Sequence, residues 1–400
     1  MGFKIIIITS EAFPNGMAGT NRIISLAKGF ISNGVQCEVI SFYKYAISGA
    51  DTPNPTAGNF DGVKFRNVFS SPFKSPHLAV RQFHEFAKPI LVLLAGLKSV
   101  GRRNVVIYYA EKTWPAVSLK IITSLRRAIM LREETEHPEI RTVGKGEIGK
   151  FLYKYLHYRL FDGLLVITQN LADYFRETLD YRKPILIVPM LVDIERFSEV
   201  SGEDSQSIVF SGELDDRKEG VTMIIKAFSL ISNRYPDLKL DLFGTAPDKS
   251  QESSFFSLVE TLKLAHRVTF HGYKNRTFMT GVLCKARMFV FSRPPSLQAH
   301  FGFSTKLGEY LATGKPVIVS QVGEISRYLR DNIDAYVCQP DPESISGKII
   351  EIQENYPRAL EIGSGGRETA TLCFNNKIES AKILEFLKAT FDLKISLNDH

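Results

Sequence analysis

Short apolar runs alternate with longer amphipathic stretches along the whole chain. Residues 5–8, 105–109 and 288–291 are nearly free of polar side chains. Uninterrupted apolar strands of this kind are typical of a parallel sheet that is covered on both faces. Stretches such as residues 21–33 and 221–235 follow these runs and have helical periodicity. The pattern predicts repeated strand–helix units and therefore a doubly wound α/β fold.

The pattern is interrupted once, by the polar and apolar-poor segment 198–206. Four hundred residues exceed one ordinary hydrophobic core and suit two domains of about 200 residues. We therefore expect a first domain over residues 1–200 and a second over 205–376. A final amphipathic helix is expected from residue 377 onwards.

The stretch 301–320 carries the clearest chemical signal. Residues 301–304 form a glycine-containing turn, 305–313 a short helix, and 317–319 a buried strand after Gly314 and Pro316. A glycine turn that leads into a helix presents free backbone N–H groups to an anion, and Ser304 or Thr305 can cap the helix. Lys306 adds a cation in the first turn, and Glu309 can accept hydrogen bonds from ligand hydroxyls. The alternative is an ordinary turn–helix–strand unit whose Lys306 and Glu309 face water.

This stretch resembles the signature of the retaining family-4 glycosyltransferases of the GT-B fold. Gly302, Phe303 and Glu309 match that signature, and so does the run from Ala312 through Ile318 except Thr313, whereas Phe301 replaces its first glutamate. The resemblance implies two Rossmann-like domains facing a cleft, with the last helix crossing back onto the first domain. It also implies that Glu309 is a catalytic candidate that binds the nucleotide ribose, and that the donor is held by Gly302, Phe303, Ser304, Thr305 and Lys306.

The resemblance extends to the loop that follows the first apolar run of the second half. Relatives have Gly-Arg there and a lysine before the next helix, and both basic side chains hold the donor diphosphate. Gly212 and Lys218 match, Glu213 replaces the arginine, and Arg217 is expected to supply the missing charge. Lys218 and Lys306 would then stabilise the departing diphosphate, with Lys218 catalytic. A charged surface turn is the alternative.

The loop 10–20 resembles the glycine loop that lies between donor phosphates and acceptor in relatives. Gly19 takes the place of one glycine of the usual pair, and Arg22 matches the arginine that follows. We expect Gly19 to touch the donor, and Thr20 and Arg22 to lie on the acceptor side. A simple strand–helix connection is the alternative.

The segment 133–139 follows a predicted strand at 128–132 and contains four carboxylates. Sites in open α/β sheets lie at the carboxyl ends of strands. Many relatives have a histidine here, so His137 is a catalytic candidate and Glu136 an acceptor-side candidate. A solvated acidic loop is equally compatible with the sequence.

Charge and composition narrow the partners without choosing one. The net charge of +7 favours anionic partners. Helix 149–161 mixes lysines with aromatic residues, and 89–97 is apolar, so either could lie on an anionic membrane, although inward packing explains both patterns too. Four scattered cysteines and the absence of a visible signal peptide predict a cytoplasmic protein, with a location at the inner face of the membrane as an alternative.

The resemblance therefore implies transfer of a sugar, with retention, from a nucleotide diphosphate sugar to a glycan or lipid-linked acceptor, as in cell-surface polysaccharide synthesis. No Asp-x-Asp or cysteine–histidine cluster is visible, so we expect no metal ion, no other cofactor and no nucleic acid partner. Two other functions remain open: a nucleotide-sugar epimerase on the same fold, and a non-catalytic glycan- or nucleotide-sugar-binding subunit.

Overall fold

The computed structural model describes residues 3–42, 54–68, 78–198 and 205–393. The chain folds as two compact units, Met1–Leu191 together with Asn376–His400, and Val192–Asn375. The division lies a few residues before the predicted linker at 198–206, because residues 192–198 already belong to the second unit. We refer to these parts as unit 1 and unit 2.

Unit 1 is built on an eight-stranded sheet with the order β3-β4-β2-β1-β5-β6-β7-β8. All neighbouring strands are parallel except the β3–β4 pair. The predicted parallel sheet is therefore confirmed. The strands are β1 (Lys4–Thr9), β2 (Gln36–Ser41), β3 (Ala57–Phe60), β4 (Val63–Asn67), β5 (Val105–Tyr109), β6 (Ile129–Glu134), β7 (Gly163–Val166) and β8 (Ile185–Ile187).

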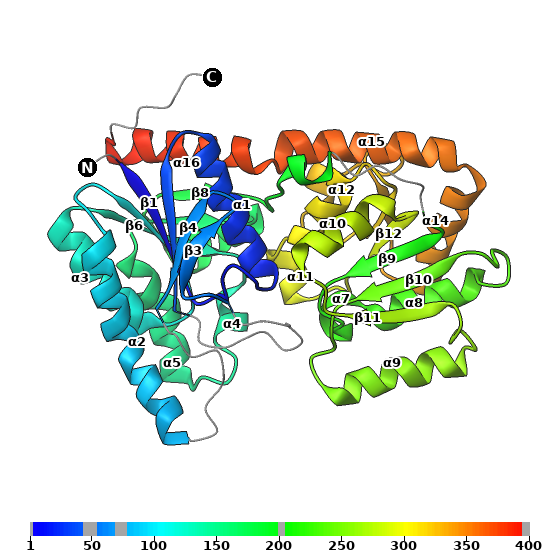
Figure 1. The fold of residues 1–400 in the computed structure, drawn as a ribbon, viewed down its shortest axis with the longest axis horizontal. Helices are drawn as coiled ribbons and strands as arrows, with labels where there is room; N and C mark the ends of the chain where they lie inside the picture. The colour runs from blue at the N-terminus through cyan, green and yellow to red at the C-terminus, as the bar shows by residue number, and fades with distance from the viewer. Residues whose placement is uncertain (1–2, 43–53, 69–77, 199–204, 394–400) are drawn as a thin grey trace. The chain divides into compact units, whose positions relative to one another are not determined.

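Helices cover both faces of this sheet (Figure 1). α1 (Ala18–Ser32) and the last helix α16 (Asn376–Phe391) share one core with the strands. α2 (Leu78–Ser99) and α3 (Thr113–Arg126) pack into a second core on the other face. The expected return of the last helix to the first domain is thus confirmed, since Ile383, Leu384 and Leu387 are fully buried in unit 1.

The remaining helices of unit 1 are short, and several predicted boundaries were wrong. The sequence predicts a helix over residues 84–97 that breaks at Pro89, but α2 continues through Pro89. The predicted helix 149–161 begins earlier as α5 (Glu147–Leu152) and continues as the π-helix η1 (Tyr153–His157) and the 3-10 helix η2 (Tyr158–Leu160). The others are α4 (Pro138–Arg141), α6 (Gln169–Asp173) and the π-helix η3 (Tyr174–Thr178).

Unit 2 contains a six-stranded parallel sheet with the order β11-β10-β9-β12-β13-β14, visible on the right of Figure 1. α8 and α14 pack on it through a core that includes Phe228 and Ile349. The strands are β9 (Ser207–Ser211), β10 (Lys239–Phe243), β11 (Val268–Gly272), β12 (Met288–Phe291), β13 (Val317–Ser320) and β14 (Tyr336–Cys338). The helices are η4 (Ile194–Phe197), α7 (Asp216–Glu219), α8 (Val221–Ile231), α9 (Lys249–Thr261), α10 (Arg276–Lys285), α11 (Leu297–Phe301), α12 (Thr305–Ala312), α13 (Ile325–Tyr328), α14 (Pro342–Glu354) and α15 (Tyr356–Cys373).

Both units are therefore doubly wound α/β sheets of the Rossmann type, as the apolar pattern predicts. All four cysteines are free thiols. No helix in the described part of the chain is long and apolar enough to cross a bilayer.

Candidate functional site

In unit 2, two glycine loops meet at the carboxyl edge of the sheet. Gly212 follows β9 and Gly244 follows β10, and both have a positive φ. A Cβ atom on Gly244 would overlap the carbonyl oxygen of Gly212, so the two backbones are in direct contact. Only glycine permits this approach and this conformation together.

Lys306 lies against this glycine contact. A Cβ atom on Gly212 would overlap the Lys306 ammonium group, so glycine leaves exactly the room that this side chain occupies. The aliphatic stem is sheltered, because only 12% of the Lys306 side chain is exposed. The first turn of α12 and the loop after β9 are thereby brought together, as expected for one shared anion site.

The Lys306 ammonium has a buried carboxylate as its partner. Its Nζ lies 2.9 Å from Oε2 of Glu219, and Nη2 of Arg293 lies 3.1 Å from Oε1 of the same residue. Burial disfavours ionisation of Glu219, but the two cations outweigh it and lower its pKa to about 2. Burial lowers the pKa of Lys306 to about 8, with Arg293 and Lys218 adding to the effect and Glu219 opposing it. Two cations and one carboxylate leave this cluster with net positive charge when Lys306 is protonated.

Lys218 and Arg217 occupy different environments. Lys218 contributes to the electrostatic field at Lys306, and its Nζ lies 3.7 Å from Oε2 of Glu213. The Arg217 side chain is 85% exposed and lies near Asp215, the residue that caps α7. Arg217 therefore does not occupy the place that we predicted for the missing arginine, because the short helix α7 directs it to solvent. Arg293, from the loop after β12, brings an arginine to the cluster instead.

Glu309 lies one turn further along α12 and already has a partner. Its Oε1 accepts a hydrogen bond of 2.6 Å from Nη1 of Arg196, and the Arg196 guanidinium is held in turn by Thr280 and by the carbonyl of Arg276. The neighbouring Tyr310 hydroxyl accepts a hydrogen bond of 2.7 Å from the backbone N–H of Ser211, which ties α12 to the end of β9. Glu309 is thus fixed in orientation beside the Gly212 loop.

The turn before α12 differs in part from the prediction. Phe301 ends α11, so the turn contains only Gly302, Phe303 and Ser304. Phe303 is buried against the rings of Tyr328 and Phe374, and the Ser304 side chain makes no capping hydrogen bond. The proposed side-chain cap is therefore wrong, and α12 begins at Thr305 with its first-turn amides uncapped by a side chain.

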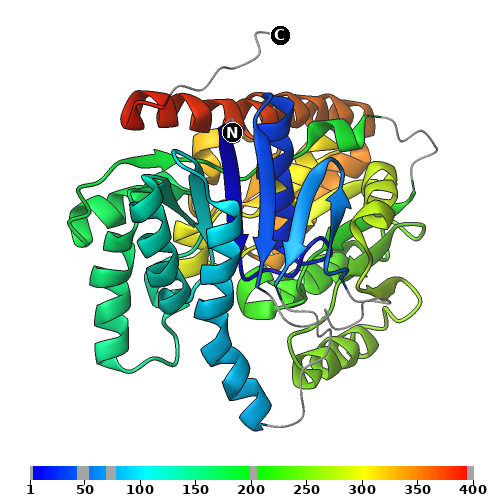
Figure 2. The same ribbon diagram turned by 60° about the vertical axis from the view of Figure 1, so that its left-hand side comes forward.

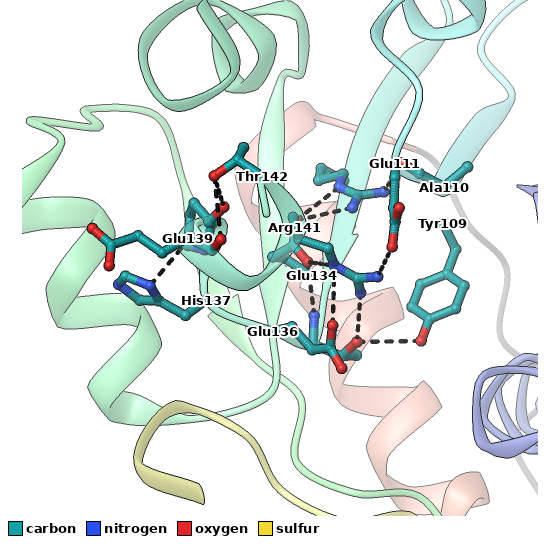
Figure 3. Close-up of polar contacts among 12 residues, drawn as sticks. Tyr109, Ala110, Glu111, Glu134, Glu136, His137, Glu139, Arg141 and Thr142 are labelled. Carbon is teal, nitrogen blue, oxygen red and sulfur yellow. Dashed lines mark hydrogen bonds and ion pairs between the residues drawn. The ribbon is translucent and has the colours of Figure 1, made fainter. Parts of the chain in front are cut away.

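In unit 1, a small cavity lies where β1, β5 and β6 end. Ser10, Glu11, Tyr109, Ala110, Glu111, Arg132 and Arg141 line it. Arg141 is the centre of its polar contacts (Figure 3): the guanidinium lies 2.5 Å from Oε1 of Glu111 and 3.3 Å from Oε1 of Glu134. Arg132 holds Oε2 of Glu134 at 2.9 Å. Although burial opposes it, these two arginines lower the pKa of Glu134 to about 2.

The first two residues of the acidic segment are therefore not part of the solvated loop that we considered, whereas Glu139 is exposed. Glu133 and Glu134 are the last residues of β6 and are fully buried. The sequence suggested a loop because charged residues end the strand, but each carboxylate has a buried arginine partner. Of the predicted residues here, Glu136 lies 3.6 Å from Arg141.

His137 has a structural partner. Its Nδ1 accepts a hydrogen bond of 3.3 Å from the N–H of Glu139 and so caps α4, and its ring packs against that of Tyr174 at an angle of 59°. Figure 3 shows the imidazole directed away from Arg141 and Tyr109. A catalytic role for His137 stays a prediction without geometric support in unit 1.

Arg22 and Thr20 fix the loop after β1. Arg22 is buried, pairs with Glu133, and donates to the carbonyls of Val188 and Pro189. The Thr20 hydroxyl donates to the carbonyl of Ala12 over 2.7 Å. Since these groups are satisfied within unit 1, they position the loop rather than present free polar atoms to a ligand.

The loop brings Glu11 into the cavity, and this residue was not predicted. A Cβ atom on Gly19 would overlap the Glu11 side chain, so the glycine at the start of α1 makes room for the carboxylate. Burial raises the pKa of Glu11, while Arg141 opposes the rise and the carboxylates of Glu111 and Glu136 add to it. The position directly after the first buried strand was the available sequence signal.

No group of three or more histidine, cysteine or acidic side chains that could hold a metal ion occurs among the residues that the structure describes. The polar groups at both sheet edges are arginines, lysines and carboxylates in ion pairs. Their chemistry suits phosphate and hydroxyl groups.

We compared the chain with known protein families and with known proteins. Residues 192–369 match the family model described as glycosyl transferases group 1. An uncharacterized glycosyltransferase of Methanocaldococcus jannaschii, MJ1607, is 24% identical over 386 residues, which are 88% of this chain and 90% of that protein.

Two solved structures extend the likeness to nearly the full chain. Sucrose-phosphate synthase from Thermosynechococcus elongatus has a TM-score of 0.73 at 15% identity, covering 97% of this chain and 99% of that one. Anabaena HepE, in complex with UDP and glucose, has a TM-score of 0.70 at 16% identity, covering 96% and 100%. The chain thus has the GT-B fold of glycosyltransferases, and its second unit carries the region that matches the glycosyl transferases group 1 family.

Proposed function

We propose that this protein is a retaining glycosyltransferase that moves a hexose from a nucleotide diphosphate sugar to a glycan or lipid-linked acceptor in the synthesis of a cell-surface polysaccharide. The observation that carries the proposal is the Lys306 ammonium, held by Glu219 against the Gly212 loop. A cation next to open backbone at the start of a helix suits an anion such as a diphosphate. The match of unit 2 to glycosyl transferases group 1 supports this reading.

The electrostatics of the cluster suit a leaving diphosphate. As the bond between the anomeric carbon and the phosphate oxygen breaks, negative charge grows on that oxygen, and a fixed cation stabilises this state more than the bound donor. Glu219, which is itself paired with Arg293, holds Lys306 in place before the donor arrives, so little reorganisation is needed. Lys218 on α7 adds a third cation, and Gly212 and Gly302 leave backbone exposed.

The ribose is assigned to Glu309. Arg196 occupies one carboxylate oxygen and leaves the other, and a carboxylate that is already oriented accepts two hydroxyl hydrogen bonds at lower entropic cost. HepE, a protein of the same fold, has been solved with UDP and glucose and with UDP-glucose. UDP-glucose is therefore the first donor to test.

The acceptor is assigned to the cavity of unit 1. Glu11 would accept a hydrogen bond from the acceptor hydroxyl, with Glu136 and Arg141 beside it. In the transfer step this hydroxyl oxygen bonds to the anomeric carbon, on the face that the diphosphate leaves. Its proton passes to the departing phosphate oxygen, so charge and atoms balance without a redox partner or a metal ion. We place this reaction in the cytoplasm, because all four cysteines are free thiols and the fold uses no disulfide.

The test is a panel of nucleotide sugars, beginning with UDP-glucose, screened by thermal shift and by donor consumption. A transferase will release nucleoside diphosphate faster when glycan or lipid-linked acceptors are added. An epimerase would convert the donor to its sugar epimer without an acceptor and without releasing nucleotide. A donor that stabilises the protein but is never consumed would indicate a non-catalytic binding subunit and contradict the proposal.

A further inference from the structure

The helices α2 and α3 expose two apolar stripes on the outer side of unit 1. The exposed fractions are 60% for Ile90, 49% for Leu94 and 44% for Leu97 on α2, and 74% for Trp114, 55% for Ile121 and 77% for Leu125 on α3. The spacing of four, three or seven residues places each set on one face of its helix. The opposite faces, with Val92 and Leu119, are buried in the core of unit 1. We call the six exposed residues the α2–α3 surface.

The two stripes belong to one continuous surface. A Cβ atom on Gly96 would lie within 2.8 Å of the side chain of Ile122, so α2 and α3 pack closely near their carboxyl ends. Each helix leads into one of the neighbouring parallel strands β5 and β6, so the two helices end at the same edge of the sheet. Figure 2 shows α2, the long cyan helix, next to its neighbours at the front of unit 1.

Basic side chains gather at this edge. Lys98, Arg102, Arg103, Arg126 and Arg127 are all exposed at or just beyond the carboxyl ends of α2 and α3. None of the five forms an ion pair with an acidic side chain in the described part of the chain. The lysines of α5 differ, since Lys150 and Lys154 are paired with glutamates.

Two of these arginines occupy positions that favour glycine or asparagine. Arg103 has a φ of 61° and Arg127, which ends α3, has a φ of 51°. Side chains other than glycine and asparagine are uncommon in this left-handed region because the backbone conformation is strained. Arg127 lies at the end of α3, whereas Arg103 lies in the turn between α2 and β5.

We propose that the α2–α3 surface docks unit 1 on a bilayer that contains anionic lipids. Apolar side chains on a helical face enter the boundary between head groups and acyl chains, where tryptophan is favoured. The cations at one end of the stripes then lie among anionic head groups, and each contributes about fivefold to binding. A protein partner would have to supply acidic groups to five unpaired cations, whereas anionic head groups supply them at any position. The inference does not depend on the proposed reaction, because docking needs no donor or acceptor.

Co-sedimentation of the full chain with vesicles tests the proposal. One set contains phosphatidylcholine alone and the other phosphatidylcholine with 30% phosphatidylglycerol. We expect binding to the anionic vesicles only, weakened by salt. The charge variant carries Arg102→Gln, Arg103→Gln, Arg126→Gln and Arg127→Gln. Four losses of about fivefold predict an affinity several hundred times lower. The matched control in unit 2 loses the same charge from exposed lysines through Lys226→Gln, Lys239→Gln, Lys249→Gln and Lys263→Gln.

The apolar part is tested separately with Trp114→Ser and Leu125→Ser. Its control removes two exposed leucines of unit 2, Leu230→Ser and Leu372→Ser. We expect at least a tenfold loss of vesicle binding for the first pair and less than twofold for the second. Equal losses in test and control variants would overturn the proposal. So would equal binding to both kinds of vesicle, no binding to either, or a dimer that dissociates when Trp114 and Leu125 are changed.

Discussion

The pH dependence of donor use should report the Lys306 ammonium. Burial lowers its pKa to about 8 from an ordinary value of 10.5. The cationic form is therefore complete below about pH 7 and is lost as the pH rises through 8. If the cation binds the diphosphate, kcat/KM for the donor falls about tenfold per pH unit above 8, because this ratio follows the ionisation of the free enzyme.

Two substitutions test whether Lys306 causes this pH dependence. Lys306→Gln removes one preorganised electrostatic contact and should reduce kcat by about 100- to 1,000-fold, or roughly 3–4 kcal/mol in the barrier. The remaining activity should be flat between pH 7 and 9.5. Glu219→Gln keeps Lys306 but removes the charge that raises its pKa, so the fall should begin at a lower pH than in the unmodified protein.

The assay is steady-state kinetics from pH 6.5 to 9.5 at constant ionic strength, with melting temperature measured for each variant. Lys285→Gln, an exposed lysine of unit 2, is the control and should retain the original profile. A profile in Lys306→Gln that still falls near pH 8 would refute the assignment, and so would an upward shift in Glu219→Gln.

Five further predictions concern four single residues and the metal requirement. Glu309→Ala should weaken nucleoside diphosphate binding tenfold or more in calorimetry, since a hydrogen bond to a charged group contributes about 1.5–3 kcal/mol; unchanged affinity would exclude the ribose contact. Arg196→Ala should weaken nucleoside diphosphate binding less than Glu309→Ala does, because the Glu309 carboxylate remains but is no longer oriented. Lys218→Ala should lower turnover with little change in the donor's KM, and wild-type turnover would make it a surface residue. Glu11→Gln should reduce kcat/KM for the acceptor at least tenfold while donor affinity stays constant, as measured by initial rates at saturating donor. Activity should survive EDTA, and a loss that magnesium or manganese restores would overturn the metal-free mechanism.

The alternation of strands and helices could be predicted from the sequence because it depends on local patterns. Each apolar run, such as residues 105–109, must be covered on both faces, because it has apolar side chains on both. The chemistry of Lys306 and Glu309 was also visible locally, since one short helix carries both.

The partners of these residues could not be predicted, because they come from distant parts of the chain. Glu219 and Lys306 are 87 positions apart, and Arg196 reaches Glu309 across 113 positions. The same reason explains the error at Glu133 and Glu134, whose charges indicated a loop. Arg22 and Arg132 neutralise them inside the sheet, and only the folded structure shows that pairing.

Calorimetric titration of nucleoside diphosphates into the unmodified protein and Lys306→Gln tests the central claim most directly, namely that the cation beside Gly212 holds a diphosphate. With uridine, guanosine, adenosine and thymidine diphosphates as the panel, we predict that at least one binds at pH 7. We predict that Lys306→Gln, checked to be folded by its cooperative melting transition, binds it about 100 times more weakly. Equal affinity of the two proteins for every nucleotide that binds would contradict the account.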